Sequence, residues 1–246
     1  MARVLMPLPD RDFDPTETAV PWRLLTREGH EVVFATEGGG APAAADPRLL
    51  DGSLGGLGCG DEPRAFYEEM SRAPSFVAPL SWSAIEPDAF DGLVLPGGHA
   101  PGMKQYLGSS LLQEKVCAFW RTGRPVGAIC HGVLVLARAK DGQSGRSVLH
   151  GARTTCLPKY MERGAYLMTF WKLGRYYRTY QAYVEDEVRD ALADPRAQFD
   201  RGPFVVKKRG TECDDIGAFV VEDGRYVSAR WPGDAYLFAR RFAARL

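Results

Sequence analysis

The sequence has no excess charge of either sign, since 31 lysine and arginine residues face 31 aspartate and glutamate residues in a chain of 246. Phosphate contacts need clustered basic residues, so we expect no nucleic acid as a partner. Long hydrophobic runs are also missing, because runs such as 133–137 and 218–221 fall far short of the roughly 20 residues that span a bilayer. Residues 1–7 follow a strand-like pattern and not that of a charged, apolar leader. We therefore expect a cytoplasmic protein with no membrane contact.

Cysteine pairs and the common metal or nucleotide motifs are absent as well. The five cysteines are odd in number, widely spaced and contain no C-x-x-C pair, which argues against a disulfide framework and against a structural zinc site. Neither H-E-x-x-H nor G-x-x-x-x-G-K-S/T occurs, and the glycines at 38–40 lack the G-x-G-x-x-G spacing of a dinucleotide turn. We therefore expect neither a metal nor a cofactor.

The order of local patterns indicates the fold class. Strand-like runs occupy 3–6, 31–36, 92–95, 125–129 and 153–156, a hairpin joins 219–221 to 226–228, and helical spacing occupies 15–28, 61–72, 110–121, 133–138, 158–192 and 234–245. Alternating strands and helices without a linker predict one α/β domain over 1–246. We expect a three-layer sandwich with a mainly parallel sheet and a small β-hairpin near the C-terminus. Residues 38–60, expected to be a loop, and 158–203 are insertions in it.

A cysteine stands where an apolar strand turns into a helix. Residues 127–132 read Gly-Ala-Ile-Cys-His-Gly, the layout of a nucleophile elbow. Such a turn points the side chain toward the amino end of the next helix, where the dipole favours thiolate over thiol. We expect Cys130 to be an ionised, reachable nucleophile, and a sulfur enclosed in hydrocarbon would contradict an enzymatic role. An inert buried cysteine is the alternative, and it is our interpretation of the other four.

Residues 96–99, Pro-Gly-Gly-His, follow the preceding strand. Neighbouring parallel strands end at the same edge of a sheet, so this turn can approach Cys130. Gly98 and His131 would then supply two backbone N–H groups to a developing oxyanion, with Gly97 and His99 beside them in the substrate site. A tight turn without any further role is the alternative for the two glycines.

Three motifs together resemble the ThiJ/PfpI superfamily, a group related to the class I glutamine amidotransferases. They are Phe-Asp-Pro-Thr-Glu at 13–17, Leu-Pro-Gly-Gly-His at 95–99, and the elbow at 127–132. The insertions at 38–60 and 158–203 are more similar to the larger heat-shock chaperone and glyoxalase III branch. The resemblance implies a flavodoxin-like fold that is often a homodimer.

The resemblance also implies a glutamate that hydrogen-bonds the cysteine sulfur, and Glu17 occupies the matching position. On spacing alone, Glu17 has a second interpretation. It stands three residues after Asp14 and could close a capping box by reaching back to the start of the first helix. The sequence cannot separate the two roles, and we assign Glu17 to the site because of the resemblance.

A histidine beside the nucleophile needs a carboxylate to orient it, and the resemblance implies one about thirty residues beyond the elbow. Glu162 falls there and would serve His131. An exposed helix glutamate is an equal alternative for Glu162. The weaker substitutes are Glu185 and Asp186.

In the leading functional hypothesis, Cys130 attacks a small electrophilic aldehyde such as methylglyoxal. His131 and Glu17 then move protons as the adduct rearranges to a 2-hydroxy acid. A cysteine hydrolase or hydratase acting on an amide, ester or isonitrile is the close alternative. A stress chaperone or redox sensor, in which Cys130 is oxidised, is the alternative of another class.

The histidine positions argue against glutaminase chemistry, because no histidine follows His150. The aromatic residues that could line the substrate pocket are Phe13, His99, Trp171 and Trp231.

Overall fold

A computed structural model describes residues 1–205 and 208–246, and a seven-stranded sheet lies at its centre. The strands stand in the order β5-β3-β1-β6-β7-β9-β8, and every neighbouring pair is parallel except β9 and β8, which form an antiparallel hairpin at one edge. A separate parallel pair consists of β2 and β4. The bounds are β1 Arg3–Pro7, β2 Arg11–Phe13, β3 Glu31–Thr36, β4 Ala44–Ala45, β5 Leu80–Ser81, β6 Gly92–Leu95, β7 Val126–Ile129, β8 Val220–Asp223 and β9 Tyr226–Ala229.

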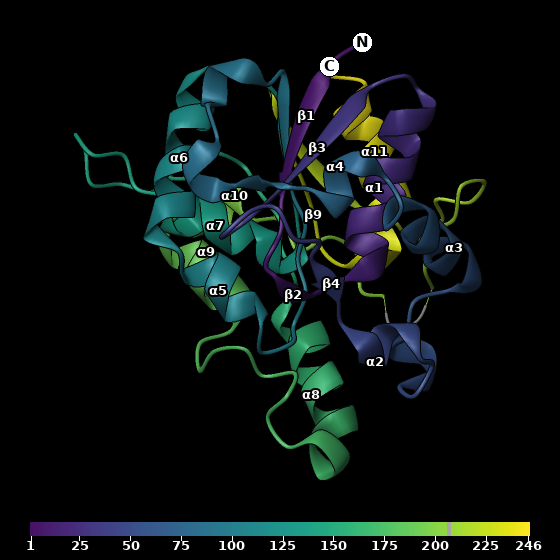
Figure 1. Cartoon of the computed structure of the whole chain (residues 1–246). Helices are drawn as coiled ribbons and strands as arrows, with labels where there is room; N and C mark the ends of the chain where they lie inside the picture. Colours follow the sequence, from purple (N-terminus) through teal and green to yellow (C-terminus); the bar gives the residue numbers. More distant parts are fainter. Residues whose placement is uncertain (206–207) are drawn as a thin grey trace.

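Helices cover both faces of the sheet (Figure 1). On one face α1, α3 and α11 pack together, and on the other α6 packs against α7, and α7 against α5 and α9. The central strands β6 and β7 are buried along their whole length, as expected for parallel strands covered on both sides. The bounds are α1 Pro15–Arg27, α2 Pro47–Leu50, α3 Asp61–Met70, α4 Pro74–Val77, α5 Met103–Gly108, α6 Ser110–Arg121, α7 Val133–Arg138, α8 Lys159–Leu173, α9 Val184–Asp190, α10 Pro195–Gln198 and α11 Ala235–Ala243. This arrangement confirms the predicted α/β sandwich, including its C-terminal hairpin.

Three stretches differ from the sequence-based expectation. Residues 153–156 form only an isolated bridge, because the Thr155 N–H donates at 2.9 Å to the side-chain hydroxyl of Ser228 in β9 and not to a backbone carbonyl of that strand. The expected loop at 38–60 contains β4, α2 and a short 3-10 turn. The helical stretch 158–192 is broken where Gly174, with φ +57°, ends α8 in a left-handed conformation.

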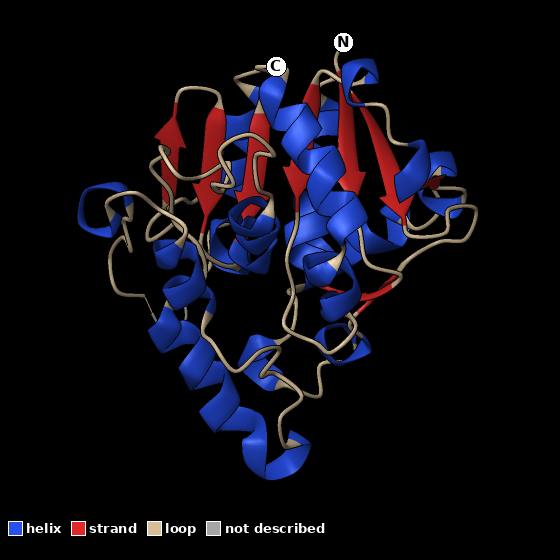
Figure 2. Cartoon of the chain, turned by 90° about the vertical axis from the view of Figure 1, so that its left-hand side faces the viewer, coloured by secondary structure: helices blue, strands red, loops and turns tan. Residues whose placement is uncertain are grey.

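The carboxyl ends of the parallel strands point toward a part of the molecule that carries the short pair β2–β4 and helices α2 and α8. Helix α8 extends away from the body of the sandwich on this side (Figures 1 and 2). Among the described helices, none is both long enough and apolar enough to cross a bilayer.

Candidate active site

Cys130 lies in a sharp turn between β7 and α7. Its φ is +58°, a left-handed value that costs a non-glycine residue roughly 1–3 kcal/mol. A 3-10 turn over Cys130–Gly132 follows, and α7 begins at Val133. A Cβ on Gly132 would overlap the carbonyl oxygen of Leu95, so only glycine lets this turn pass the end of β6. The local backbone is that of the predicted nucleophile elbow.

The turn after β6 lies directly against this elbow. A Cβ on Gly97 would stand 2.8 Å from the amide nitrogen of His131 and 2.7 Å from Glu17 Oε2. Gly98 has φ +154° and no room for a Cβ, which would meet the carbonyl oxygen of Asp12 at 2.9 Å. The structure therefore brings Gly97, Gly98 and His131 together at one sheet edge, as parallel strands require.

Glu17 reaches this turn from the first part of α1. Its carboxyl group is fully buried, and the Gly97 N–H donates to Oε2 at 3.0 Å. The start of α1 is capped by Asp14, whose Oδ1 accepts from the N–H groups of Thr16 and Glu17 at 2.8 and 3.1 Å. The Glu17 side chain thus lies against the Gly97 turn and does not close a capping box. Burial first, and then the Asp14 charge, raise the pKa of Glu17 well above its usual value, and a side-chain hydrogen bond with Cys130 opposes them.

The thiol of Cys130 is closed off from solvent, contrary to the expectation of a reachable thiolate. Burial raises the pKa of Cys130 well above its usual value, the charges of Glu17 and Asp14 add to this, and the His131 N–H opposes them. The helix dipole cannot outweigh the removal of water beside two carboxyl groups. Cys130 is therefore a protonated thiol in this conformation. Its neighbours are polar as well as apolar, so the sulfur is not enclosed in hydrocarbon alone.

His131 lies next to the sulfur, and His99 lies against His131. His131 Nδ1 lies 3.5 Å from Cys130 Sγ, while its Nε2 has no hydrogen-bond partner among the residues that the structure describes. The ring of His99 meets the ring of His131 edge to face, with centroids 4.9 Å apart. Burial lowers the pKa of His99 to about 4, and burial together with His99 and two arginines lowers the pKa of His131 well below its usual value. Both rings are neutral at pH 7.

Glu162 does not meet His131, which corrects the prediction of a third member for the Cys-His pair. Its Oε1 accepts from Arg178 Nη1 at 2.9 Å and its Oε2 from the Val184 N–H at 2.9 Å. Glu162 is 1% exposed, so the alternative of a solvated helix glutamate is wrong too. Because Gly174 ends α8, the chain turns back and places Arg178 over Glu162. This buried pair joins α8 to the segment 174–183.

The two substitutes for Glu162 are also engaged elsewhere. Glu185 accepts from the Lys159 N–H at 2.9 Å and pairs with Arg201, and Asp186 pairs with Lys159 Nζ at 2.6 Å. In the part of the chain that the structure describes, neither forms a hydrogen bond with His131. The imidazole of His131 is therefore placed by backbone geometry and by the ring of His99.

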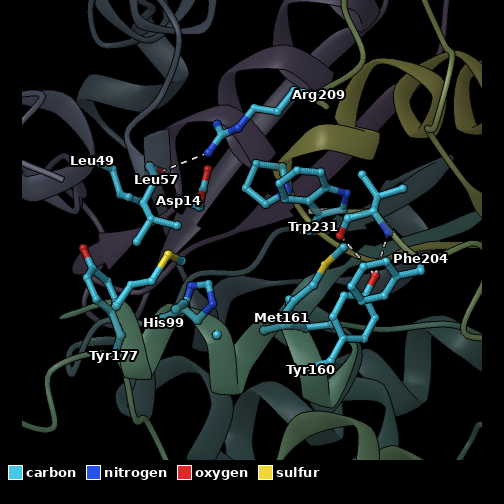
Figure 3. Close-up of a pocket in the computed structure, with 16 residues that line it drawn as sticks. Asp14, Leu49, Leu57, His99, Tyr160, Met161, Tyr177, Phe204, Arg209 and Trp231 are labelled. Carbon is cyan, nitrogen blue, oxygen red and sulfur yellow. Dashed lines mark hydrogen bonds between the residues drawn. The ribbon is translucent and has the colours of Figure 1, made fainter. Parts of the chain in front are cut away.

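A pocket of about 230 Å³ opens beside His99 (Figure 3). Trp231 lines it too, whereas Phe13 is buried in the core and Trp171 is 75% exposed on α8. The ring of His99 touches both this pocket and His131, so it stands between the pocket and the elbow. Sequence reasoning missed Arg209 as a lining residue and treated Asp14 only as a cap. The residues that line the pocket are Asp14, Leu49, Leu57, His99, Leu157, Tyr160, Met161, Gly164, Ala165, Met168, Tyr177, Phe204, Val205, Arg209, Trp231 and Pro232.

Asp14 joins the pocket to the elbow. Its N–H donates to the Gly97 carbonyl at 2.9 Å, and its carboxyl group faces the pocket. Burial raises the pKa of Asp14 to about 6, and the positive charge of Arg209 opposes this rise. Asp14 therefore titrates close to neutral pH, unlike an ordinary surface aspartate.

Residues 8–203 match a family model described as ThiJ/PfpI family-like. "Deglycase PYRAB04690" of Pyrococcus abyssi is 27% identical over 244 residues, which is 98% of this chain and 96% of that protein. "Deglycase TK1284" of Thermococcus kodakarensis is 30% identical over 169 residues, and the match spans 66% of each chain. The crystal structure of glyoxalase III from Candida albicans superposes with a TM-score of 0.71 at 18% identity, covering 100% of this chain and 97% of that one, which shows a shared fold.

Proposed function

The chain belongs to the ThiJ/PfpI family, and from this premise we propose that it is a cofactor-independent cysteine enzyme acting on small reactive carbonyls. It would convert a 2-oxoaldehyde into a 2-hydroxy acid, as a glyoxalase III or a deglycase-like enzyme. The observation that carries the proposal is the left-handed backbone of Cys130, which holds Sγ 3.5 Å from His131 Nδ1 and beside Glu17. A strained backbone of this kind persists only where the surrounding structure enforces it, and it gathers at functional sites.

The reaction begins when Cys130 Sγ attacks the aldehyde carbon. The neutral ring of His131 can take the thiol proton through Nδ1 as the S–C bond forms. The high pKa of the thiol and the low pKa of the ring both oppose a free proton transfer, so the transfer has to accompany bond formation. The carbonyl oxygen gains the negative charge. The N–H groups of Gly98 and His131 are at the right sheet edge to receive it.

The resulting hemithioacetal rearranges without an outside oxidant. The hydrogen on the former aldehyde carbon leaves as a proton, an enediol forms, and a proton returns to the neighbouring carbon. The first carbon is thereby oxidised to a thioester while the second is reduced to an alcohol. Glu17 and His131 move this proton, and the raised pKa of Glu17 favours a protonated carboxyl group that can donate one. Water then cleaves the thioester and regenerates the thiol.

Access to the sulfur depends on His99. Its ring stands between the pocket and His131, and in the described residues no hydrogen bond holds its imidazole. The Thr179 hydroxyl donates a hydrogen bond to the backbone carbonyl of His99 at 2.6 Å. A rotation of this ring would admit a substrate to Cys130 and close the site again, keeping bulk water from the intermediates.

The test is lactate formation from methylglyoxal in a buffer free of glutathione. Cys130→Ser should lower the rate at least about a thousandfold, because the thiol forms the covalent bond. Cys213→Ser is the matched control, since Cys213 is exposed, and it should retain the wild-type rate. Turnover that persists in Cys130→Ser would overturn the proposal. So would a wild-type protein that hydrolyses amides, esters or isonitriles but no 2-oxoaldehyde.

A further inference from the structure

We propose that the substrate is a 2-oxoaldehyde with a bulky apolar tail, about the size of a phenyl ring or a branched alkyl chain, and that this tail fills the pocket beside His99. The inference rests on the proposed function and names its substrate class. The pocket measures about 230 Å³. A cavity of about 150 Å³ with an apolar lining already binds benzene. The single methyl group of methylglyoxal would leave most of the pocket empty.

The pocket has two polar groups with apolar side chains on both sides of them. The polar groups are Asp14 and His99, and both touch the elbow region, Asp14 through Gly97 and His99 through His131. Leu49 and Leu57 lie on one side of these groups, and aromatic and aliphatic side chains lie on the other (Figure 3). A 2-oxoaldehyde with its two carbonyl groups toward Cys130 would therefore place its tail among apolar groups. The residues of these walls are Leu49, Leu57, Met161, Phe204 and Trp231.

The tyrosine hydroxyls of the lining already have partners. The Tyr160 hydroxyl accepts from the Val205 N–H at 3.1 Å and donates to the Val205 carbonyl at 3.3 Å. The Tyr177 hydroxyl donates to Asp46 at 2.7 Å. A sugar-like or amide tail would lose its hydrogen bonds to water in this pocket and find few replacements, which disfavours it.

The charged groups of the lining do not favour an ionised tail either. Among the described lining residues, Asp14 and Arg209 carry charge, and their signs are opposite. Arg209 donates to the Leu57 carbonyl at 3.0 Å, and its guanidinium lies 5.7 Å from the ring centre of Trp231. The positive charge of Arg209 lowers the pKa of Asp14, so Asp14 already balances part of the Arg209 charge. An uncharged apolar tail fits these walls best.

Gly164 offers a direct way to test the pocket. It lies in α8 and lines the pocket, and a Cβ built on it would meet no atom within 4 Å. Gly164→Leu therefore adds volume to the cavity wall, and its Cβ meets no clash. Met161→Gln is the second variant, since it keeps the length of the side chain and makes the wall polar. Arg163→Leu is the matched control, because Arg163 is exposed on the same helix and does not line the pocket.

The experiment measures kcat/KM for phenylglyoxal and for methylglyoxal and compares their ratio between proteins, which cancels the intrinsic reactivity of each aldehyde. Gly164→Leu and Met161→Gln should each lower the phenylglyoxal-to-methylglyoxal ratio about tenfold or more, as expected when an apolar pocket loses fit. Arg163→Leu should leave the ratio unchanged. A ratio that neither pocket variant changes would overturn the inference while leaving the proposed function intact.

A binding measurement that involves no reaction distinguishes the proposed function from the pocket assignment. Acetophenone has the same aryl ketone but no aldehyde, and its affinity for the Cys130→Ser protein is measurable by calorimetry. We expect the added Gly164→Leu change to weaken this binding about tenfold or more. If the protein turns over no 2-oxoaldehyde yet shows this dependence, the proposed function fails and the apolar pocket stands. If acetophenone binds equally well to both variants, the pocket assignment fails.

Discussion

The elbow and the α8 wall of the pocket meet at His99, and they differ in how freely their residues can be changed. At the elbow, Gly97 and Gly132 have backbone atoms of other strands where a side chain would begin. On α8, Gly164 faces open space, and the apolar side chains of Met168 and Trp171 are exposed. At the elbow, an added side-chain atom at either glycine thus causes a clash. On the α8 wall of the pocket, Gly164 has room for one.

The largest effect should come from glycine-to-alanine changes on the two sides. Gly132→Ala places a methyl group against the Leu95 carbonyl and should lower the free energy of unfolding by about 4 kcal/mol or more. Gly164→Ala should leave stability equal or raise it by up to about 1 kcal/mol, because alanine favours a helix. Urea denaturation of both variants measures the difference. Equal stabilities would show that the contrast between elbow and α8 is wrong.

Glu17→Gln tests the chemistry of the elbow without changing its shape. The amide keeps an acceptor for the Gly97 N–H but loses the exchangeable acid proton, so kcat/KM for methylglyoxal should fall about a hundredfold to a thousandfold. The pKa of the Cys130 thiol should fall, because the Glu17 charge contributes to its rise. Glu68→Gln, at an exposed position of α3, is the control. A variant with wild-type kcat/KM and an unchanged thiol pKa would remove Glu17 from the site.

Asp14 connects the two sides, and its effect depends on pH. Its pKa is about 6 in the folded protein against an ordinary 3.8, so the folded state binds the proton more tightly than the unfolded state. This stabilisation is complete below pH 4 and is lost as the pH rises through 6, by up to about 3 kcal/mol. Asp14→Asn keeps the helix cap, and its free energy of unfolding should not fall in this way as the pH rises. Denaturation curves between pH 4 and pH 7 measure it, and identical pH dependence in the two proteins would contradict the assignment.

Glu162→Gln tests whether α8 contributes structure or chemistry. Weakening the buried pair with Arg178 should lower the free energy of unfolding by about 1–2 kcal/mol. The shape of the pH profile of kcat should stay the same, because Glu162 does not contact His131. Asp186→Asn removes the exposed ion pair between α9 and Lys159 of α8, and it should lower the free energy of unfolding by less than about 1 kcal/mol. A changed pH profile in Glu162→Gln would restore the original prediction of a Cys-His-Glu arrangement.

The smallest effect concerns thiol reactivity. Iodoacetamide should modify Cys213 about tenfold faster than Cys130 at pH 7, because Cys213 is exposed and the buried Cys130 is protonated. Peptide mass mapping at several times gives both rates. If Cys130 reacts first, the sulfur is ionised and reachable, and the closed position of the His99 ring is not the resting state.

Prediction from the sequence succeeded where a short segment carries its own constraint. The elbow was readable from the glycine and the cysteine between a buried strand and a helix, and the first helix from the sequence Asp14-Pro15. It failed where partners come from distant segments. Nothing near Glu162 in the sequence indicates that Arg178 returns to it, and nothing near Arg209 indicates a pocket wall. The raised pKa of the Cys130 thiol depends in the same way on Asp14 and Glu17, which lie far from it in the sequence.

The amino-acid sequence by itself determined the alternation of strands and helices, the glycine turns and the position of the cysteine at a strand end, because these follow from local backbone conformation and apolar spacing. Only the tertiary structure decided that the Glu17 side chain contacts Gly97 and not the helix start, that Glu162 binds Arg178, and that burial raises the pKa of the Cys130 thiol. These outcomes depend on which groups share a water-free space. That is a property of the packed molecule, because removal of water disfavours the charged forms of buried groups and strengthens the hydrogen bonds between them.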